Sequence, residues 1–114
     1  MPTIPNTQYL IPGTQHGSFS PDGKSYTITT PNAPRHWYNY LWNEHYVSLV
    51  SQVGQGESFS QDGMGNRIPL VSARMLFVRD QGSGEFWAAN GGAPGDRDYR
   101  CTHARGHSTI ELTH

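Results

Sequence analysis

The sequence predicts an all-β protein built as an antiparallel β-sandwich, and three observations lead to this fold class. Short segments in which apolar and polar residues alternate recur along the chain, as expected for half-buried strands. Turn-forming clusters separate these segments, and the chain holds 13 glycines and 8 prolines. No longer stretch has the helical period of an amphipathic helix. Roughly seven short strands at this spacing are typical of a sandwich.

Composition limits the kind of protein this is. The chain has 114 residues, enough for one domain with one core. Hydrophobic residues make up 34%, below the usual value of about 45–50%. We therefore expect a thin core that something outside this chain completes. The net charge of −1, without a basic stripe, argues against a nucleic-acid partner.

The same survey bears on location. No apolar run is long enough to span a membrane, and the first residues lack the basic start and apolar centre of a secretory signal. Cys101 is the single cysteine, so no intrachain disulfide can form. We therefore expect a cytoplasmic protein with no membrane contact.

Two parts are predicted along the chain: an extended N-terminal arm over residues 1–16 and a β-sandwich domain over residues 17–114. Recurring prolines predict the arm. The sandwich is expected to begin with a hairpin over residues 17–30. Its turn is "PDG", in which Pro21 presets φ and Gly23 supplies a positive φ. The alternating segment "KSYTITT" that follows predicts a half-buried strand.

The remaining elements are expected to alternate between strands and turns. In chain order they are a strand, turn and strand over 45–60, a turn over 61–67, the most apolar strand over 73–80, its hairpin partner over 81–89, a loop over 90–98, and two strands around Gly106 over 99–113. The last strand has no visible cap before His114. Because an uncovered edge invites strand pairing, we expect the sandwich to continue outside this chain, and the protein to oligomerise or to bind a partner chain.

Large aromatic residues gather in residues 29–46, "TTPNAPRHWYNYLWNEHY". Such rings suit the amphipathic faces of sugars, but they also fill the space between two sheets or form a protein interface. We favour packing, and the alternatives stay open. The candidate carbohydrate or interface residues are Trp37, Tyr40, Trp42, Tyr46 and, further along, Trp87.

A second group of candidates lies in "CTHARGH", where Cys101, His103 and His107 are close in sequence. Zinc accepts such ligands, but only three lie together, and residues two apart in a strand share a face in any case. A buried thiol with strand histidines is the favoured interpretation. The aspartates of the turn clusters are expected to form local hydrogen bonds rather than a catalytic pair.

Three motifs resemble one known family. The first is similar to "Y-x-I-T-T-P-x-x-P-x-x-W-x-N-Y-L-x-N-x-x-Y" and comprises Tyr26, Ile28, Thr29, Thr30, Pro31, Pro34, Trp37, Asn39, Tyr40, Leu41, Asn43 and Tyr46. The second is similar to "R-x-x-Y-I-R-D-x-x-T-G-E-Y-W" and comprises Arg74, Phe77, Val78, Arg79, Asp80, Gly84, Glu85, Phe86 and Trp87. The third is similar to "C-x-H-G-x-G-Y-T" and comprises Cys101, His103, Gly106, His107 and Thr109. Here Ala104 and Arg105 stand where the family usually has a glycine and another residue, and His107 stands where it usually has an aromatic. With this order the chain resembles the inverting glycoside phosphorylases of glycoside hydrolase family ninety-four.

The resemblance implies that this chain is the front part of a larger N-terminal β-sandwich, which a helical linker and an (α/α)₆ barrel follow. The family's general acid and phosphate-binding residues belong to the barrel, so no catalytic residue and no cofactor is expected here. The implied role is a non-catalytic scaffold or assembly domain that self-associates or docks a partner chain. Two alternatives are a carbohydrate-binding module for β-glucan oligosaccharides and an accessory subunit of a split phosphorylase.

Overall fold

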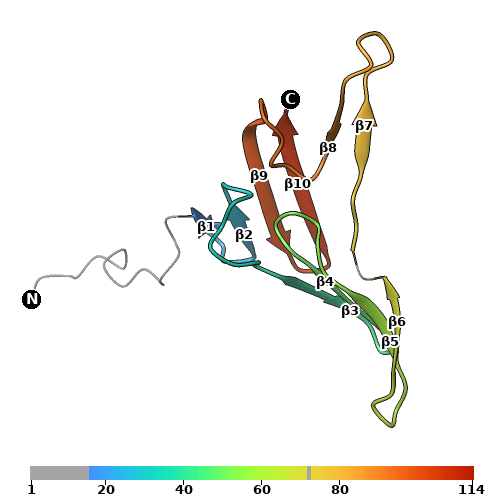
Figure 1. Cartoon of the computed structure of the whole chain (residues 1–114). Coiled ribbons are helices and arrows are strands. Elements are labelled where there is room, and N and C mark those ends of the chain that lie inside the picture. The colour runs from blue at the N-terminus through green and yellow to red at the C-terminus, as the bar shows by residue number, and fades with distance from the viewer. Residues whose placement is uncertain (1–15, 72) are drawn as a thin grey trace, which may run out of the picture.

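The computed structural model describes residues 16–71 and 73–114, and these residues confirm the all-β, antiparallel fold class. They form two four-stranded sheets and a separate two-stranded hairpin, and no helix (Figure 1). The predicted arm lies, apart from His16, outside the described residues. Among the described residues, no helix could serve as a membrane span.

The first sheet joins the two ends of the chain. Its strands are β1 (Gly17–Phe19), β2 (Ser25–Ile28), β9 (Arg97–Ala104) and β10 (His107–Thr113), in the order β1-β2-β9-β10. The hairpin predicted over residues 17–30 is confirmed as β1 and β2, with Gly23 at φ +70° in its turn. The two strands predicted around Gly106 are β9 and β10, so the expected loop over 90–98 ends earlier than predicted.

The second sheet has the order β3-β4-β5-β6, with strands β3 (Asn39–Trp42), β4 (Tyr46–Val50), β5 (Ser58–Gln61) and β6 (Arg67–Val71). The strand, turn and strand predicted over residues 45–60 are confirmed as β4 and β5. Strands β3 and β6 were not predicted. Both lie at sheet edges, where a missing backbone N–H is tolerated, and this accounts for Pro69 inside β6.

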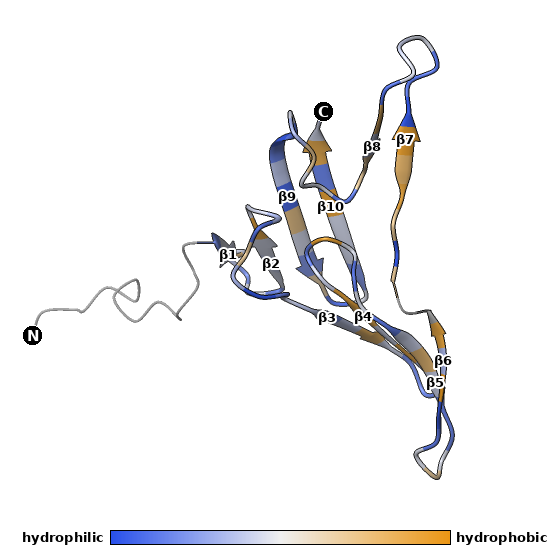
Figure 2. Ribbon diagram, in the orientation of Figure 1, coloured by the Kyte–Doolittle hydropathy of each residue, from blue (hydrophilic) through white to orange (hydrophobic). Residues whose placement is uncertain are grey.

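The hairpin of β7 (Phe77–Arg79) and β8 (Phe86–Ala88) confirms the predicted pairing, but its strands are shorter than expected. The segment expected to be the most apolar strand is exposed rather than buried, with Leu76 64% and Phe77 56% accessible. Figure 2 shows apolar residues along β7, which stands apart from the first sheet.

The buried core of the described residues is small, as predicted. Its hydrophobic members are Ile28, Phe59 and Cys101, and Ile28 lies opposite Cys101 in the β2–β9 pairing. The Cα radius of gyration is 17.3 Å, compared with about 13 Å for a compact domain of about 100 residues. The two sheets meet where β3 begins and diverge from there (Figure 1). This meeting point holds the candidate site.

Candidate functional site

Trp37, just before β3, is fixed by both sheets. Its backbone N–H donates to Gln52 Oε1 (2.9 Å), in the loop between β4 and β5. Its backbone carbonyl accepts from His103 Nε2 (2.7 Å), on β9. An irregular segment must satisfy its backbone groups somewhere, and here two buried or half-buried side chains do so. We call this connection, made by Trp37, Gln52 and His103, the junction.

Gln52 is the most buried polar side chain of the junction, with 1% of its surface exposed. Its amide nitrogen donates to the carbonyl of Pro31 (3.4 Å). Its own backbone carbonyl accepts a hydrogen bond from the Tyr99 hydroxyl, on β9. One residue thus connects the proline-containing segment, the second sheet and the first sheet.

A series of hydrogen bonds through the first sheet connects Asn39 to Trp37. The Asn39 amide donates to the carbonyls of Ala104 (2.8 Å) and His107 (3.0 Å) and to Ser108 Oγ (3.1 Å), which fixes the start of β3 against the β9–β10 turn. Ser108 Oγ lies 2.8 Å from His103 Nδ1.

The tautomer of His103 follows from these partners. A carbonyl can only accept, so Nε2 carries the proton and Nδ1 accepts from the Ser108 hydroxyl. Burial lowers the pKa of His103, while the bond to the Trp37 carbonyl opposes that shift. The ring is therefore neutral near pH 7, and both of its nitrogens are occupied.

Aromatic rings line one side of the junction. The Trp37 ring stacks on Tyr26, with centroids 5.2 Å apart and an interplanar angle of 15°. The Phe19 ring makes an edge contact with Tyr26, with ring centroids 4.8 Å apart. These three residues come from β1, β2 and the segment before β3, so stacking also holds the sheets together.

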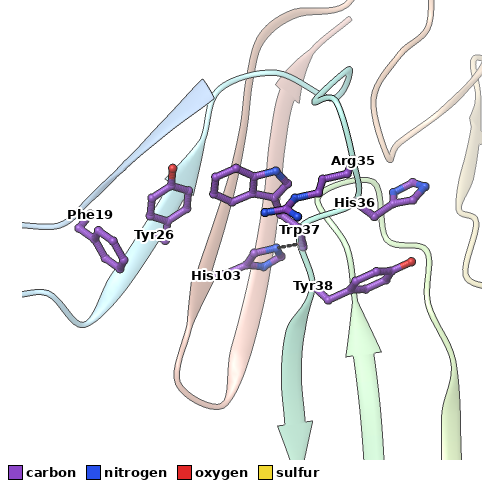
Figure 3. Close-up of a pocket in the computed structure, with 7 residues that line it drawn as sticks. All are labelled: Phe19, Tyr26, Arg35, His36, Trp37, Tyr38 and His103. Atoms are coloured by element: carbon purple, nitrogen blue, oxygen red, sulfur yellow. Dashed lines mark hydrogen bonds between the residues drawn. The ribbon is translucent and has the colours of Figure 1, made fainter. Parts of the chain in front are cut away.

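A pocket of ≈ 440 Å³ opens beside these three aromatic rings (Figure 3). Its lining consists of Phe19, Tyr26, Arg35, His36, Trp37, Tyr38 and His103. The Tyr26 hydroxyl is buried and has no hydrogen-bond partner in the described part of the chain, and burial raises the pKa of Tyr26. The Tyr26 ring thus lines the pocket as aromatic surface, while its hydroxyl oxygen is buried away from the solvent.

The predicted aromatic candidates do not form one surface. Trp37 lies at the junction, whereas Tyr40 (62% exposed) and Trp42 (75% exposed) share one face of β3. Tyr46 begins β4 beside the turn that Asn43 caps, where Asn43 Oδ1 accepts from the Tyr46 N–H at 2.9 Å. Packing between sheets therefore describes Trp37, and it does not describe Tyr40 or Trp42 within this chain.

Trp87, on β8, belongs to a separate cluster. Its ring stacks on the imidazole of His114, with centroids 4.1 Å apart. His114 Nδ1 lies 2.9 Å from Asp96 and Nε2 lies 3.1 Å from Glu85. Both nitrogens face carboxylates, which only accept, so these bonds favour the protonated ring and raise the pKa of His114.

The weak metal candidates are only partly brought together. Cys101 Sγ lies 3.8 Å from His103 Nδ1, while His107 is exposed on β10. Burial raises the pKa of Cys101 to about 11, so the thiol is protonated near neutral pH. Within residues 16–71 and 73–114, no group of three His, Cys, Asp or Glu side chains is placed to hold a metal ion.

The turn aspartates form local hydrogen bonds. Asp62 accepts from the side-chain amide of Asn66 and from the backbone N–H of Asn66 and Met64, and Asp80 accepts from the backbone N–H of Ser83 and Gly82. These bonds favour the charged form and lower the pKa of both carboxyls. An exposed carboxylate held in its own turn is not arranged for acid–base chemistry.

Sequence reasoning missed several polar residues that position the site. Gln52 was not singled out. Neither was Asn90, whose amide donates to the carbonyls of Val53 (2.7 Å) and Arg74 (3.0 Å). Arg74 in turn donates to the Leu49 carbonyl and to buried serine hydroxyls on β4 and β5. The only available signal was the position of Asn39 and Arg74 within the quoted motifs.

Comparison with known proteins gives a family. The model described as "Glycosyl hydrolase 94, supersandwich domain" matches residues 24–114. A 3-O-β-D-glucopyranosyl-β-D-glucuronide phosphorylase of Paenibacillus borealis is 37% identical over 73 residues, which is 64% of this chain and 9% of that protein. A solabiose phosphorylase of the same organism is 30% identical over 108 residues, 83% of this chain and 14% of that protein.

A third relative is the N,N'-diacetylchitobiose phosphorylase of Vibrio furnissii. It is 29% identical over 84 residues, which is 67% of this chain and 10% of that protein. The chain thus spans between 9% and 14% of the length of these curated relatives.

Proposed function

We propose a structural role for this chain, and the premise is its family: the chain belongs to the supersandwich domain family of glycosyl hydrolase 94. In this role the chain is a non-catalytic scaffold of a glycoside phosphorylase. Its relatives are named for phosphorylase activities on disaccharides, and glycosyl transfer to phosphate would be carried out outside these residues. The chain's own contribution is to pack against the rest of the assembly.

The observation that carries this proposal is the imbalance between buried and exposed apolar side chains. In the described residues three hydrophobic side chains are buried, whereas large ones remain accessible on β3, on β6 and along the β7–β8 hairpin. Large apolar side chains that stay accessible in such number are expected at interaction sites. Within the described residues, β3, β6 and the two hairpin strands are edge strands, whose outer backbone groups another strand can bind. We propose that these surfaces mediate homo-oligomerisation or docking of a partner chain, in the cytoplasm.

Light scattering coupled to size exclusion tests the proposal. The chain is expected to elute as an oligomer at micromolar concentration, and the double substitution Trp42→Ser with Phe77→Ser is expected to shift it toward the monomer. A matched double substitution at exposed polar positions, Gln55→Ala with Thr113→Ala, is expected to leave the mass unchanged. A wild-type chain that is monomeric throughout would contradict homo-oligomerisation and would leave docking of a different partner chain as the remaining form of the proposal.

A second candidate function is carbohydrate binding, and the aromatic pocket beside Trp37 is the observation that favours it. Flat rings with polar groups at their margin suit the two-sided character of a pyranose. A β-glucan oligosaccharide is the proposed ligand, and saturable binding measured by NMR titration is the test. Tyr38 lines the pocket and is exposed, so Tyr38→Ala should weaken binding without unfolding the chain.

A further inference from the structure

We propose that the pocket beside Trp37 binds a hexopyranoside that carries a carboxylate, a hexuronate, with the sugar ring against the aromatic lining and the carboxylate on Arg35. This inference rests on the proposed carbohydrate-binding function and adds the class of sugar. Three properties of the pocket lead to it: its apolar surface, its free hydrogen-bonding groups and its charge.

The apolar surface suits a single sugar ring. Phe19, Tyr26 and Trp37 supply aromatic carbon to the pocket, and Figure 3 shows their rings following one another along its wall. A volume of ≈ 440 Å³ lies within the range of about 300–1,000 Å³ that small-molecule sites occupy. The axial C–H groups of a β-linked pyranose present an apolar face that packs on such rings.

The free polar groups identify which residues can contact a ligand. His103 has both nitrogens occupied, by the Trp37 carbonyl and by Ser108 Oγ, so it offers no hydrogen bond. The Tyr26 hydroxyl has no partner in the described residues, but the oxygen is buried and is therefore not exposed to a ligand in the pocket. The Arg35 guanidinium likewise has no hydrogen bond or ion pair to any residue of 16–71 or 73–114. Its planar group of five donors is the strongest unused group of the pocket.

The charge of the pocket favours an anion. Arg35 is the lining residue with a fixed charge, and no Asp or Glu lines the pocket. All 9 acidic residues of the chain fall within the described residues, and none forms an ion pair with Arg35. By contrast, Arg100 is paired with Glu111 at 3.2 Å, and Arg67 lies over the Phe59 ring at 4.4 Å.

A carboxylate matches Arg35 in shape as well as charge. Guanidinium and carboxylate are both planar, and they form two parallel charge-assisted hydrogen bonds. In a hexuronate the carboxylate projects from C5 of the ring. The sugar ring can therefore lie against the aromatic side chains while the carboxylate reaches Arg35. A neutral hexose offers the Arg35 guanidinium a hydroxyl group in place of the carboxylate.

A matched pair of sugars tests this. Methyl β-D-glucuronide and methyl β-D-glucoside share one ring and differ at C6, where the first has a carboxylate and the second a hydroxymethyl group. Each is titrated into the ¹⁵N-labelled 114-residue chain, and the Trp37 indole signal, assigned with Trp37→Phe, is followed. We expect the glucuronide to bind about fivefold more tightly, the preference that one partly exposed charge pair provides.

Two variants test whether Arg35 is the source of the preference for the glucuronide over the glucoside. Arg35→Gln is expected to abolish it while the affinity for the glucoside stays the same. Arg79→Gln, at an exposed arginine on β7 that does not line the pocket, is expected to preserve it. Circular dichroism checks that both variants fold. Should Arg35→Gln fail to fold, the two sugars still decide the proposal in the wild-type chain.

The outcomes are distinct. Equal affinity for both sugars would overturn the hexuronate assignment and leave carbohydrate binding standing. No saturable shift with either sugar would overturn both. Sodium acetate that binds as tightly as the glucuronide would reduce the site to one for simple anions, and would overturn the inference. A preference that survives Arg35→Gln would also overturn it, because Arg35 would not be its source.

Discussion

The junction and the β7–β8 hairpin are both rich in large apolar side chains, yet only the junction is held within this chain. At the junction, both backbone groups of Trp37 are bonded to side chains from different sheets, and its ring stacks on Tyr26. Along the hairpin, Phe77 and its neighbours are exposed. Strand β8 contacts the C-terminal end of the first sheet through the stacking of Trp87 on His114.

Polar partners, rather than hydropathy, account for this difference. Gln52, Asn39 and His103 each donate or accept across the meeting point of the two sheets, and each would be costly to leave unpaired. The exposed side of the hairpin has no comparable set of buried polar partners in the described residues. We infer that residues of this chain are sufficient to hold the junction, and that the hairpin is a docking surface.

The largest expected loss comes from Gln52→Ala. This change removes the acceptor of the Trp37 N–H and the donor to Pro31, and it leaves buried groups unpaired. The free energy of unfolding, measured by urea denaturation, should fall by about 3 kcal/mol. The neighbouring Gln55 is exposed, and Gln55→Ala should cost no more than about 0.5 kcal/mol. Similar losses in the two variants would remove Gln52 from the centre of the junction.

Asn39→Ala should have the next largest effect. Its amide nitrogen donates to the carbonyls of half-buried Ala104 and exposed His107, and both carbonyls lose this partner when the side chain is shortened. We expect a loss of about 2 kcal/mol in the free energy of unfolding. Asn32 is exposed, and the control Asn32→Ala should be close to neutral. A neutral Asn39→Ala would indicate that β3 is held against the first sheet by stacking alone.

The His114 cluster gives a smaller, pH-dependent effect. Its folded pKa is raised above the ordinary 6.5 by Asp96 and Glu85, so its stabilising contribution is complete below about pH 6.5 and is lost as pH rises through the folded value. The pKa of Asp96 is lowered, so its part is lost only in acid, as pH falls through that lower value. An NMR titration of the imidazole should give a midpoint above 6.5, and Glu85→Gln should lower it. A wild-type midpoint at or below the ordinary value would refute the cluster.

Phe77→Ser should have the smallest effect on folding. The side chain is exposed, so the free energy of unfolding of the monomer should change by no more than about 0.5 kcal/mol. Self-association should weaken instead, because apolar area is lost from the docking surface. Thermal melting and light scattering on the same sample separate the two quantities. A marked loss of monomer stability would mean that the hairpin is already packed within this chain.

Sequence reasoning predicted the local elements better than the site. The "PDG" hairpin and the strands around Gly106 were recognisable because turn chemistry and alternation are local properties. Strands β3 and β6 were not, since Pro69 and a crowded run of aromatics argue against strands unless the edge position is known. The exposure of Phe77 was equally hidden, because a pattern shows which residues are apolar and not what covers them.

The polar residues of the junction were the hardest to predict. Gln52 and Asn39 act across 15 and 65 or more residues of sequence, and nothing next to them in the chain indicates those partners. Trp37 was singled out as an aromatic, but its role depends on its backbone groups. The motif spacing around Asn39 indicated the family without indicating this chemistry.

Hydrogen exchange at two protein concentrations tests the central claim most directly. The claim predicts that the Trp37 amide and the β2–β9 amides are protected equally at low and high concentration, because this chain alone holds them. The β7–β8 amides should be weakly protected when dilute and should gain protection as the chains associate. Protection of the hairpin that equals that of the junction at every concentration would contradict the account.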